Sequence, residues 1–372
     1  MRILKLRQAA ALALLAVSAL STIAWTNPAI PHYRIVDLGT LGGSDSSAQA
    51  LNDRDEVVGW AETADGRRHA FLYNAGVMQD LGTLVGGSNS YATAINERGQ
   101  VAGYSGINAF GPQFPEVYQG FIWDQDGMTS LGALFCPCSY NDRYGKSGGY
   151  GINDQGWVTG DSETVRGSWV VHAMLWRAGS VDDLGGGAGD WSISRLFDVN
   201  DGGVAVGDYA PDGGRQQVFD REASLWRNGA RTGLGTLPGY NSSTALAVNQ
   251  SGLVVGWSGT YDGASSHAFL WHGHDMRDLG ALRHAANSSA LAINGSGEVV
   301  GWSGEPGGVS HAFLWRAGSM FDLNESIPEY SGWILNQASG INRRGDVVGT
   351  GTHQGEVHAF MLLTQEPYGD RD

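Results

Sequence analysis

The sequence has 372 residues, of which 57 are glycine, 10 proline and 2 cysteine, and its formal net charge is −15. Its 42% hydrophobic residues can bury a core, which excludes global disorder, and its low proline content without a Gly-X-Y period excludes collagen. The acidic balance argues against nucleic acid as a partner, and two cysteines exclude a disulfide-dense scaffold.

The first 24 residues have the pattern of a secretory signal. Three basic residues come first, an apolar run spans 9–20, and small residues follow, with cleavage expected after Ser21 or Ala24. The apolar run is shorter than the roughly 20 residues that a membrane-spanning helix needs. We therefore expect export to the periplasm, the cell surface or the medium, with no membrane span after signal removal. An uncleaved N-terminal anchor is the alternative.

A short motif recurs seven times after this segment. It consists of an Asn followed seven residues later by a Gly, and this offset is constant although successive Asn residues are 44 to 57 positions apart. The form Asn-x-x-Gly, as in NERG at 96–99, suits a type I turn followed by a left-handed residue and predicts a tight hairpin. The first copy has Asp55 in place of that glycine. The asparagines are Asn52, Asn96, Asn153, Asn200, Asn249, Asn294 and Asn342.

Each repeat contains four short segments with the alternation and turn residues of β-strands. The first ends in the Asn, and the second carries the later Gly, which we expect to let an aromatic side chain approach the backbone. The third segment reads HAFLW at 267–271, and the fourth reads DLGTL at 80–84. Four strands per repeat is the size of one β-propeller blade. The sequence thus predicts an all-β, seven-bladed propeller over 25–365, followed by a short polar tail at 366–372.

The fourth segment is out of step with the other three. Its first copy, YRIVDLGTL at 33–41, precedes the first complete set, whereas the last set ends at residue 362 without a fourth strand after it. We therefore predict that the N-terminal strand completes the last blade and closes the ring, which removes exposed sheet edges.

The HAFLW, DLGTL and N-x-x-G-x-V-x-G elements resemble the HAF-repeat family of extracellular bacterial proteins. The resemblance covers nearly all of residues 33–362 and implies a secreted or surface protein, but no reaction. The chain departs from the family pattern at Gln119 and Glu222, where the His of the third segment is replaced.

The recurring His that begins the third segment has two interpretations. A metal-binding ring is one, but the third strand of a blade does not line the central channel, so we favour a buried structural hydrogen bond. We accordingly predict no metal site and no cofactor. His272 and His274 are expected in a solvated turn, with an adventitious metal site as the alternative. The recurring residues are His69, His172, His267, His311 and His358.

The insertions fall in the loops between strands two and three and between blades, which share one face of a propeller. Binding residues concentrate on loops held by a rigid scaffold. Five of six insertions belong to blades 2 to 4, and they gather aromatic side chains, which stack on sugar rings, and basic ones, which bind carboxylate or sulfate. The candidate ligand-binding residues are Tyr118, Tyr140, Arg143, Tyr144, Lys146, Trp169, Trp191 and Arg195, together with Arg166.

Cys136 and Cys138 flank a proline within one insertion. A strained disulfide, free or intermolecular thiols, and a metal site are the alternatives for this pair.

No motif for a nucleophilic serine, a zinc protease, a P-loop or a dinucleotide site occurs. We therefore predict a secreted, monomeric binding or interaction propeller whose ligand is a polysaccharide or another cell-surface molecule. The alternative is a carbohydrate-active enzyme such as a uronate polysaccharide lyase. In it, Tyr140, Tyr144 or Tyr118 moves the proton, and the carboxylate is neutralised by Arg143, Lys146 and Arg195. A third hypothesis is that the chain is a structural protein of the cell envelope.

Overall fold

In the computed structural model of this chain, the described residues are β-strands joined by turns, with one short 3-10 helix. No helix among them is long and apolar enough to cross a membrane. The predicted signal, the polar tail, Cys136 and Cys138 lie outside the described residues. The structure describes residues 31–108, 116–134, 145–164, 170–177, 179–185, 192–211, 221–260, 262–283 and 285–365.

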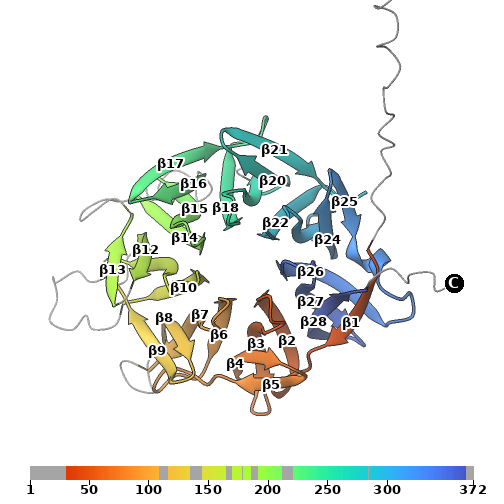
Figure 1. Cartoon of the computed structure of the whole chain (residues 1–372), viewed down its shortest axis with the longest axis horizontal. Helices are drawn as coiled ribbons and strands as arrows, with labels where there is room; N and C mark the ends of the chain where they lie inside the picture. The colour runs from red at the N-terminus through yellow and green to blue at the C-terminus, as the bar shows by residue number, and fades with distance from the viewer. Residues whose placement is uncertain are drawn as a thin grey trace, which may run out of the picture.

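The strands pair in chain order into four-stranded antiparallel sheets, as the repeat pattern predicts, and Figure 1 shows these sheets set around a common centre. The first three sheets contain β2 (Gly42–Leu51), β3 (Val57–Thr63), β4 (Arg68–Asn74) and β5 (Val77–Asp80); β6 (Ser90–Ile95), β7 (Val101–Ile107), β8 (Val117–Asp124) and β9 (Gly127–Gly132); and β10 (Ser147–Ile152), β11 (Val158–Glu163), β12 (Val171–Arg177) and β13 (Ser180–Asp183).

The next three sets of four strands follow the same order. A single parallel bridge between Ser266 and Asn287 joins the second and third of these sets into one eight-stranded sheet. The strands are β14 (Ile193–Val199), β15 (Val204–Ala210), β16 (Glu222–Arg227) and β17 (Ala230–Gly235); β18 (Ser242–Val248), β19 (Val254–Gly259), β20 (Ser266–His272) and β21 (Asp275–Gly280); and β22 (Asn287–Ile293), β23 (Val299–Gly304), β24 (Ser310–Arg316) and β25 (Ser319–Asp322), which η1 (Leu323–Ser326) follows.

The last sheet is built from both ends of the chain. Its strands are β26 (Trp333–Ile341), β27 (Val347–His353), β28 (Glu356–Thr364) and β1 (Tyr33–Asp37). β1 runs antiparallel to β28, with Tyr33 opposite Thr364 and Asp37 opposite Phe360. The N-terminal segment is therefore the fourth strand of this sheet. Figure 1 shows the last sheet beside the first, and β2 packs against β26, β27 and β28.

The hairpin between the first two strands of each sheet is the predicted Asn turn. In the hairpin of β18 and β19, the Asn249 carbonyl accepts a 3.0 Å hydrogen bond from Gly252 N. The Asn249 Oδ1 accepts from the backbone N–H groups of Ser251 and Leu253 at 3.1 and 3.0 Å. Asp55 takes the left-handed conformation at φ +63°, as its replacement of glycine requires.

The same Asn side chain also joins each hairpin to the next, a role that the turn pattern does not reveal. Asn249 Nδ2 donates a 3.0 Å hydrogen bond to the Asn294 carbonyl, and Asn294 Nδ2 donates to that of Asn342 at 3.1 Å. The bond recurs at each earlier step from Asn52 onward. Asn342 Nδ2 donates to Asp55 Oδ1 at 3.4 Å, so the series returns to the first hairpin.

Each second strand needs its glycine mainly because a carbonyl oxygen of the first strand leaves no room for a Cβ. Contact with an aromatic ring is the smaller reason. A Cβ on Gly256 would lie 1.9 Å from the Thr244 carbonyl oxygen of β18. At Gly103 a Cβ would also meet Phe121 at 2.6 Å, so the expected aromatic contact is present in that sheet. The main constraint is the close approach of the bulged first strand, which no residue larger than glycine allows.

The core lies between neighbouring sheets. One cluster joins Val58 and Ala70 of the first sheet to Ile95 and Phe121 of the second. The phenylalanine of the third-strand motif is fully buried wherever it occurs, and burial of each such ring contributes about 2–3 kcal/mol. These residues are Phe71, Phe121, Phe269, Phe313 and Phe360.

We expect Asn249→Ala to lower the free energy of unfolding by about 2 kcal/mol. Two N–H groups of the turn lose their acceptor, and the Asn294 carbonyl, which also accepts from Gly297 N, loses one of its two donors. Asn241, which is exposed, supplies the matched control, and its alanine variant should stay within about 0.5 kcal/mol of the parent. Urea unfolding measures both. Equal losses in the two variants would contradict a bridging role for the buried Asn.

Candidate functional site

Three of the candidate ligand-binding residues belong to the part of the chain that the structure describes. Tyr118 is on β8, Lys146 directly precedes β10, and Arg195 is on β14, so they come from three consecutive sheets. The remaining candidates lie outside the described residues: Tyr140, Arg143, Tyr144, Arg166, Trp169 and Trp191.

A row of aromatic rings extends across these three sheets. The rings of Tyr91 and Tyr104 are stacked with centroids 5.1 Å apart, and Tyr118 lies 5.9 Å from Tyr104 in an edge contact. Tyr104 also contacts Tyr150 of β10 at 6.5 Å, and Tyr150 lies 5.7 Å from Phe197 of β14. The rings therefore form one continuous row from the second sheet to the fourth, and each of them is partly buried.

The row ends at a cluster of ionisable groups around Arg195. The Arg195 guanidinium carbon lies 5.2 Å from the centroid of the Phe197 ring, and the guanidinium bonds to the Asp208 carboxylate at 2.6 and 3.1 Å. Asp208 is fully buried and also accepts from Arg221 at 3.3 Å. Tyr150 Oη donates to Asp161 Oδ1 at 3.1 Å. Two arginines thus share one buried carboxylate beside the aromatic row.

Burial sets the protonation of this cluster. It raises the pKa of Asp161 to about 6, although the nearby Arg195 acts in the opposite direction. Burial also raises the pKa of Tyr150 far above its ordinary value, with the Asp161 charge adding to the effect. At neutral pH, Tyr150 therefore serves as a hydrogen-bond donor and not as a base.

Lys146 directly precedes β10, the strand of Tyr150, and has a partner of its own. Its Nζ is 3.4 Å from Glu163 Oε1, and its side chain is 65% exposed while that of Glu163 is 8% exposed. Gln119, which follows Tyr118, donates from Nε2 to the Gly145 carbonyl at 3.4 Å, so the start of β10 is held beside β8. The lysine thus presents an accessible positive charge at the start of the strand that carries Tyr150.

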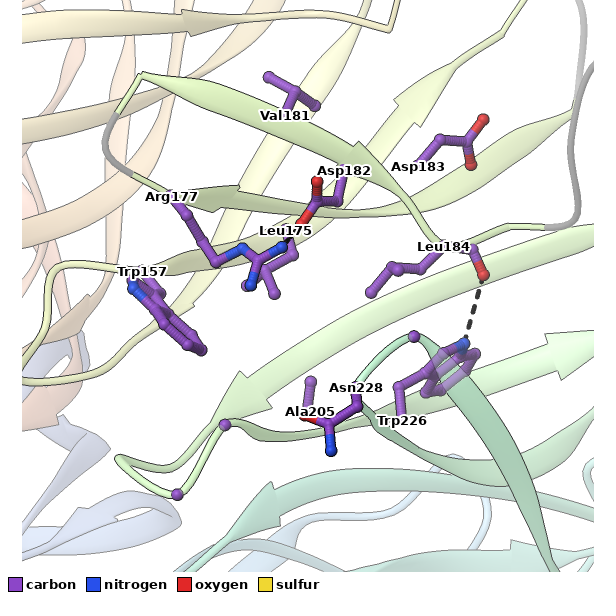
Figure 2. Close-up of a pocket in the computed structure, with 13 residues that line it drawn as sticks. Trp157, Leu175, Arg177, Val181, Asp182, Asp183, Leu184, Ala205, Trp226 and Asn228 are labelled. Carbon is purple, nitrogen blue, oxygen red and sulfur yellow. Dashed lines mark hydrogen bonds and ion pairs between the residues drawn. The ribbon is translucent and has the colours of Figure 1, made fainter.

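A pocket of about 620 Å³ lies between the third and fourth sheets (Figure 2). Its lining comes mainly from strands β12, β13, β15 and β16, together with turn residues such as Gly203 and Asn228. Arg177 lies 5.1 Å over the Trp157 ring and forms an ion pair with Asp182. Because Arg177 and Asp182 are paired with each other, these charged groups of the pocket are less available to a ligand.

Each recurring His is hydrogen-bonded, as expected, and the partner is the Asp of the fourth-strand motif. His267 Nδ1 lies 2.9 Å from Asp278 Oδ2, for example, and His358 Nδ1 lies 2.9 Å from Asp37 Oδ2 across the two chain ends. The expectation of complete burial is correct only for His172, with a side chain 1% exposed; the others are partly exposed. The other pairs are His69 with Asp80, His172 with Asp183, and His311 with Asp322.

The two repeats that lack the His have changed its partner as well. Gln119 Oε1 accepts a 2.9 Å bond from Ser130, which stands where other repeats have Asp. In the fourth sheet the equivalent residue is Gly233, and a Cβ there would lie 2.3 Å from Glu222 Oε1. Glu222 pairs instead with Arg231 at 3.2 Å. These paired replacements, and not the adjacent long loops alone, explain why the His could be lost.

The sequence matches no protein-family model, and no curated protein sequence is similar to it. Among solved structures, it is similar to a puromycin-hydrolysing peptidase from Mycobacterium tuberculosis, with a TM-score of 0.55, 14% identity and 90% of this chain covered. The chain spans about half of that peptidase, 54% of its length. It is also similar to the β-propeller domain of the Trilobed protease from Pyrococcus furiosus, with a TM-score of 0.51, 10% identity, and coverage of 88% of this chain and 99% of that one. At such identities the likeness shows a β-propeller fold and nothing of activity.

The raised pKa of Asp161 predicts a pH dependence of stability. The folded protein retains a proton that the unfolded chain loses above pH 4, so the free energy of unfolding falls as pH rises from about 4 to about 6. In Asp161→Asn the side chain keeps an oxygen that can accept the Tyr150 hydrogen bond, but it cannot ionise. The stability of this variant relative to the parent should therefore increase on the order of 3 kcal/mol across that window, measured by urea unfolding.

Asp126, which is exposed in a turn, supplies the control for this measurement. The difference between the parent and Asp126→Asn should not change with pH. If Asp161→Asn also shows no pH-dependent difference, the carboxyl is not held protonated by its surroundings.

Proposed function

We propose that this chain is an exported propeller of seven four-stranded blades and that the N-terminal strand closes the ring. The support for closure is local and physical. β1 pairs with β28, and the last Asn of the series contacts Asp55 of the first hairpin. Next to this contact, Arg343 forms a 2.5 Å ion pair with Asp53. The signal at 1–24 and membership of the HAF-repeat family are part of the same proposal and rest on the sequence motifs.

Deleting residues 31–40 should destabilise the whole domain, because it removes the buried side chains of Tyr33 and Leu38 and exposes the edge of β28. Deleting the polar tail at 366–372 is the matched control and should leave the thermal unfolding midpoint unchanged. A single unfolding transition at the parental temperature in the first deletion would contradict closure.

We infer that the function is ligand binding and that the ligand lies over blades 2 to 4. The observation that carries this proposal is the continuous row from Tyr91 to Phe197. The exposed cation of Lys146 stands at the start of β10, the strand that carries Tyr150. Tyrosine rings offer flat faces to sugar rings, and exposed cations attract carboxylate groups. A polysaccharide containing uronate residues has both features, so it is the ligand class that the row fits best.

The arrangement favours binding over catalysis. Arg195 is already committed to the buried Asp208 carboxylate, which limits its capacity to neutralise a developing charge. Tyr150 has a raised pKa and is a poor base. A uronate lyase is the second candidate because Asp161, with a pKa near 6, has the acidity of a proton-transfer group at neutral pH and lies beside a tyrosine.

Binding to alginate and polygalacturonate, with dextran as the neutral comparison, tests the proposal by calorimetry. Tyr118→Ala should weaken binding of the acidic polymers by at least about tenfold, equal to about 1.4 kcal/mol, and Lys146→Ala should weaken it at low salt. Tyr330, which is 93% exposed on the loop before β26, is the matched control, and Tyr330→Ala should bind as the parent does.

The same samples should produce no unsaturated sugar, measured by its ultraviolet absorbance. Accumulation of that product would favour the lyase. If Tyr118→Ala and Lys146→Ala bind as the parent does and Tyr330→Ala loses binding, the ligand does not lie over blades 2 to 4 and the proposal is wrong.

A further inference from the structure

A second histidine joins the His–Asp pair of the sheet built from both chain ends. His353 Nδ1, at the end of β27, lies 3.2 Å from Asp37 Oδ2, and His358 Nδ1 lies 2.9 Å from the same oxygen. Within the described residues, this is the group of at least three His, Cys, Asp or Glu side chains whose ligand atoms all lie within 4.8 Å of one another. Two imidazoles and a carboxylate therefore converge on one point.

The second histidine is not a feature of the repeat. Four residues after the second-strand glycine, where this sheet has His353, the first sheet has Thr63, the fifth has Thr260 and the sixth has Glu305. The His–Asp pairs of the first, fifth and sixth sheets thus have no imidazole at the matching position. The additional ligand occurs where the Asp comes from the opposite end of the chain.

The neighbouring side chains orient both imidazoles. The Trp333 indole stacks on the His353 ring with centroids 4.6 Å apart and planes inclined by 3°. The outward Nε2 of His358 lies 3.5 Å from Glu356 Oε2. A metal-binding histidine commonly donates its second ring N–H to a carboxylate, which fixes its tautomer and strengthens it as a ligand.

We propose that Asp37, His353 and His358 bind a divalent transition-metal ion through two Nδ1 atoms and one carboxylate oxygen. Imidazole nitrogen together with carboxylate oxygen suits Zn²⁺ and its first-row neighbours, and it does not suit Ca²⁺ or Mg²⁺, which take oxygen ligands. The His353 and His358 side chains are 21% and 16% exposed and that of Asp37 is 33% exposed, so an ion can reach the site from solvent.

The position of the site gives the ion a structural role. Asp37 is the last residue of β1, while the two histidines belong to β27 and β28. An ion bound to all three fastens the five-residue N-terminal strand to the hairpin that it borders. Because the ion binds only when β1 is docked, its binding free energy adds to the stability of that docking.

Calorimetry with Zn²⁺ on the full chain, prepared without an oligohistidine tag and stripped with chelator, tests the binding. We expect one ion per chain, with affinity at least about tenfold lower in His353→Gln. His267→Gln, which breaks a His–Asp pair without a second imidazole, should bind as the parent does. The double variant His272→Ala with His274→Ala controls for adventitious binding at that exposed turn.

Failure of the parent to bind Zn²⁺ would overturn the proposal and leave two hydrogen bonds to Asp37 as the whole interaction. Binding that persists in His353→Gln and disappears in the double variant would overturn it as well. Co²⁺ provides an independent measure, because its visible absorption reports nitrogen and oxygen ligands directly, and the spectrum of the parent should be lost in His353→Gln.

Hydrogen exchange tests the fastening role separately from binding. Zn²⁺ should slow exchange of the β1 amides at 33–37 in the parent and leave them unchanged in His353→Gln, whose fold can be verified by circular dichroism. An ion that binds without slowing exchange in β1 would disprove the fastening role. None of these measurements depends on a polysaccharide ligand, so their outcome is independent of the proposed ligand binding.

Discussion

The hydrogen bond from one buried Asn side chain to the carbonyl of the next hairpin is the constraint on which the architecture depends. Each Asn closes its own turn with Oδ1 and contacts the neighbouring turn with Nδ2, so a single side chain sets both the hairpin and the spacing between sheets. A donor and an acceptor in a buried amide are costly to leave without partners. The seven-residue offset between Asn and Gly is therefore invariant, while the repeat length varies.

A second series of hydrogen bonds joins the sheets toward the opposite end. Ser90 Oγ of β6 accepts from the Ala70 N–H at 2.8 Å and donates to the Gly82 carbonyl at 2.6 Å, which links the third- and fourth-strand motifs of one sheet to the next. Ser288 and Ser46 make the same two bonds, the latter to the last sheet. With the sheets tied at both ends, loops of different length leave the scaffold without disturbing it.

The strand assignments and the role of the N-terminal segment could be predicted because they follow from local rules. Alternation, turn residues and repeat spacing act within a few positions of the chain. The serine contacts were missed although a signal exists: Ser46, Ser90 and Ser288 each precede the motif Asn by six residues. The candidate site stays a prediction: its sector and its residues Tyr118, Lys146 and Arg195 were inferred from loop lengths and residue type.

The sequence by itself determined an all-β chain of four-stranded repeats, the turn chemistry of each Asn, and a last sheet shared between the two chain ends. Only the tertiary structure decided which side chains meet between sheets. The row from Tyr91 to Phe197, the arginines around Asp208 and the meeting of Asp37 with His353 join residues from different strands or opposite chain ends. Their contacts depend on how far one sheet is rotated from the next, and that rotation is set by packing across the interface, which no local pattern encodes.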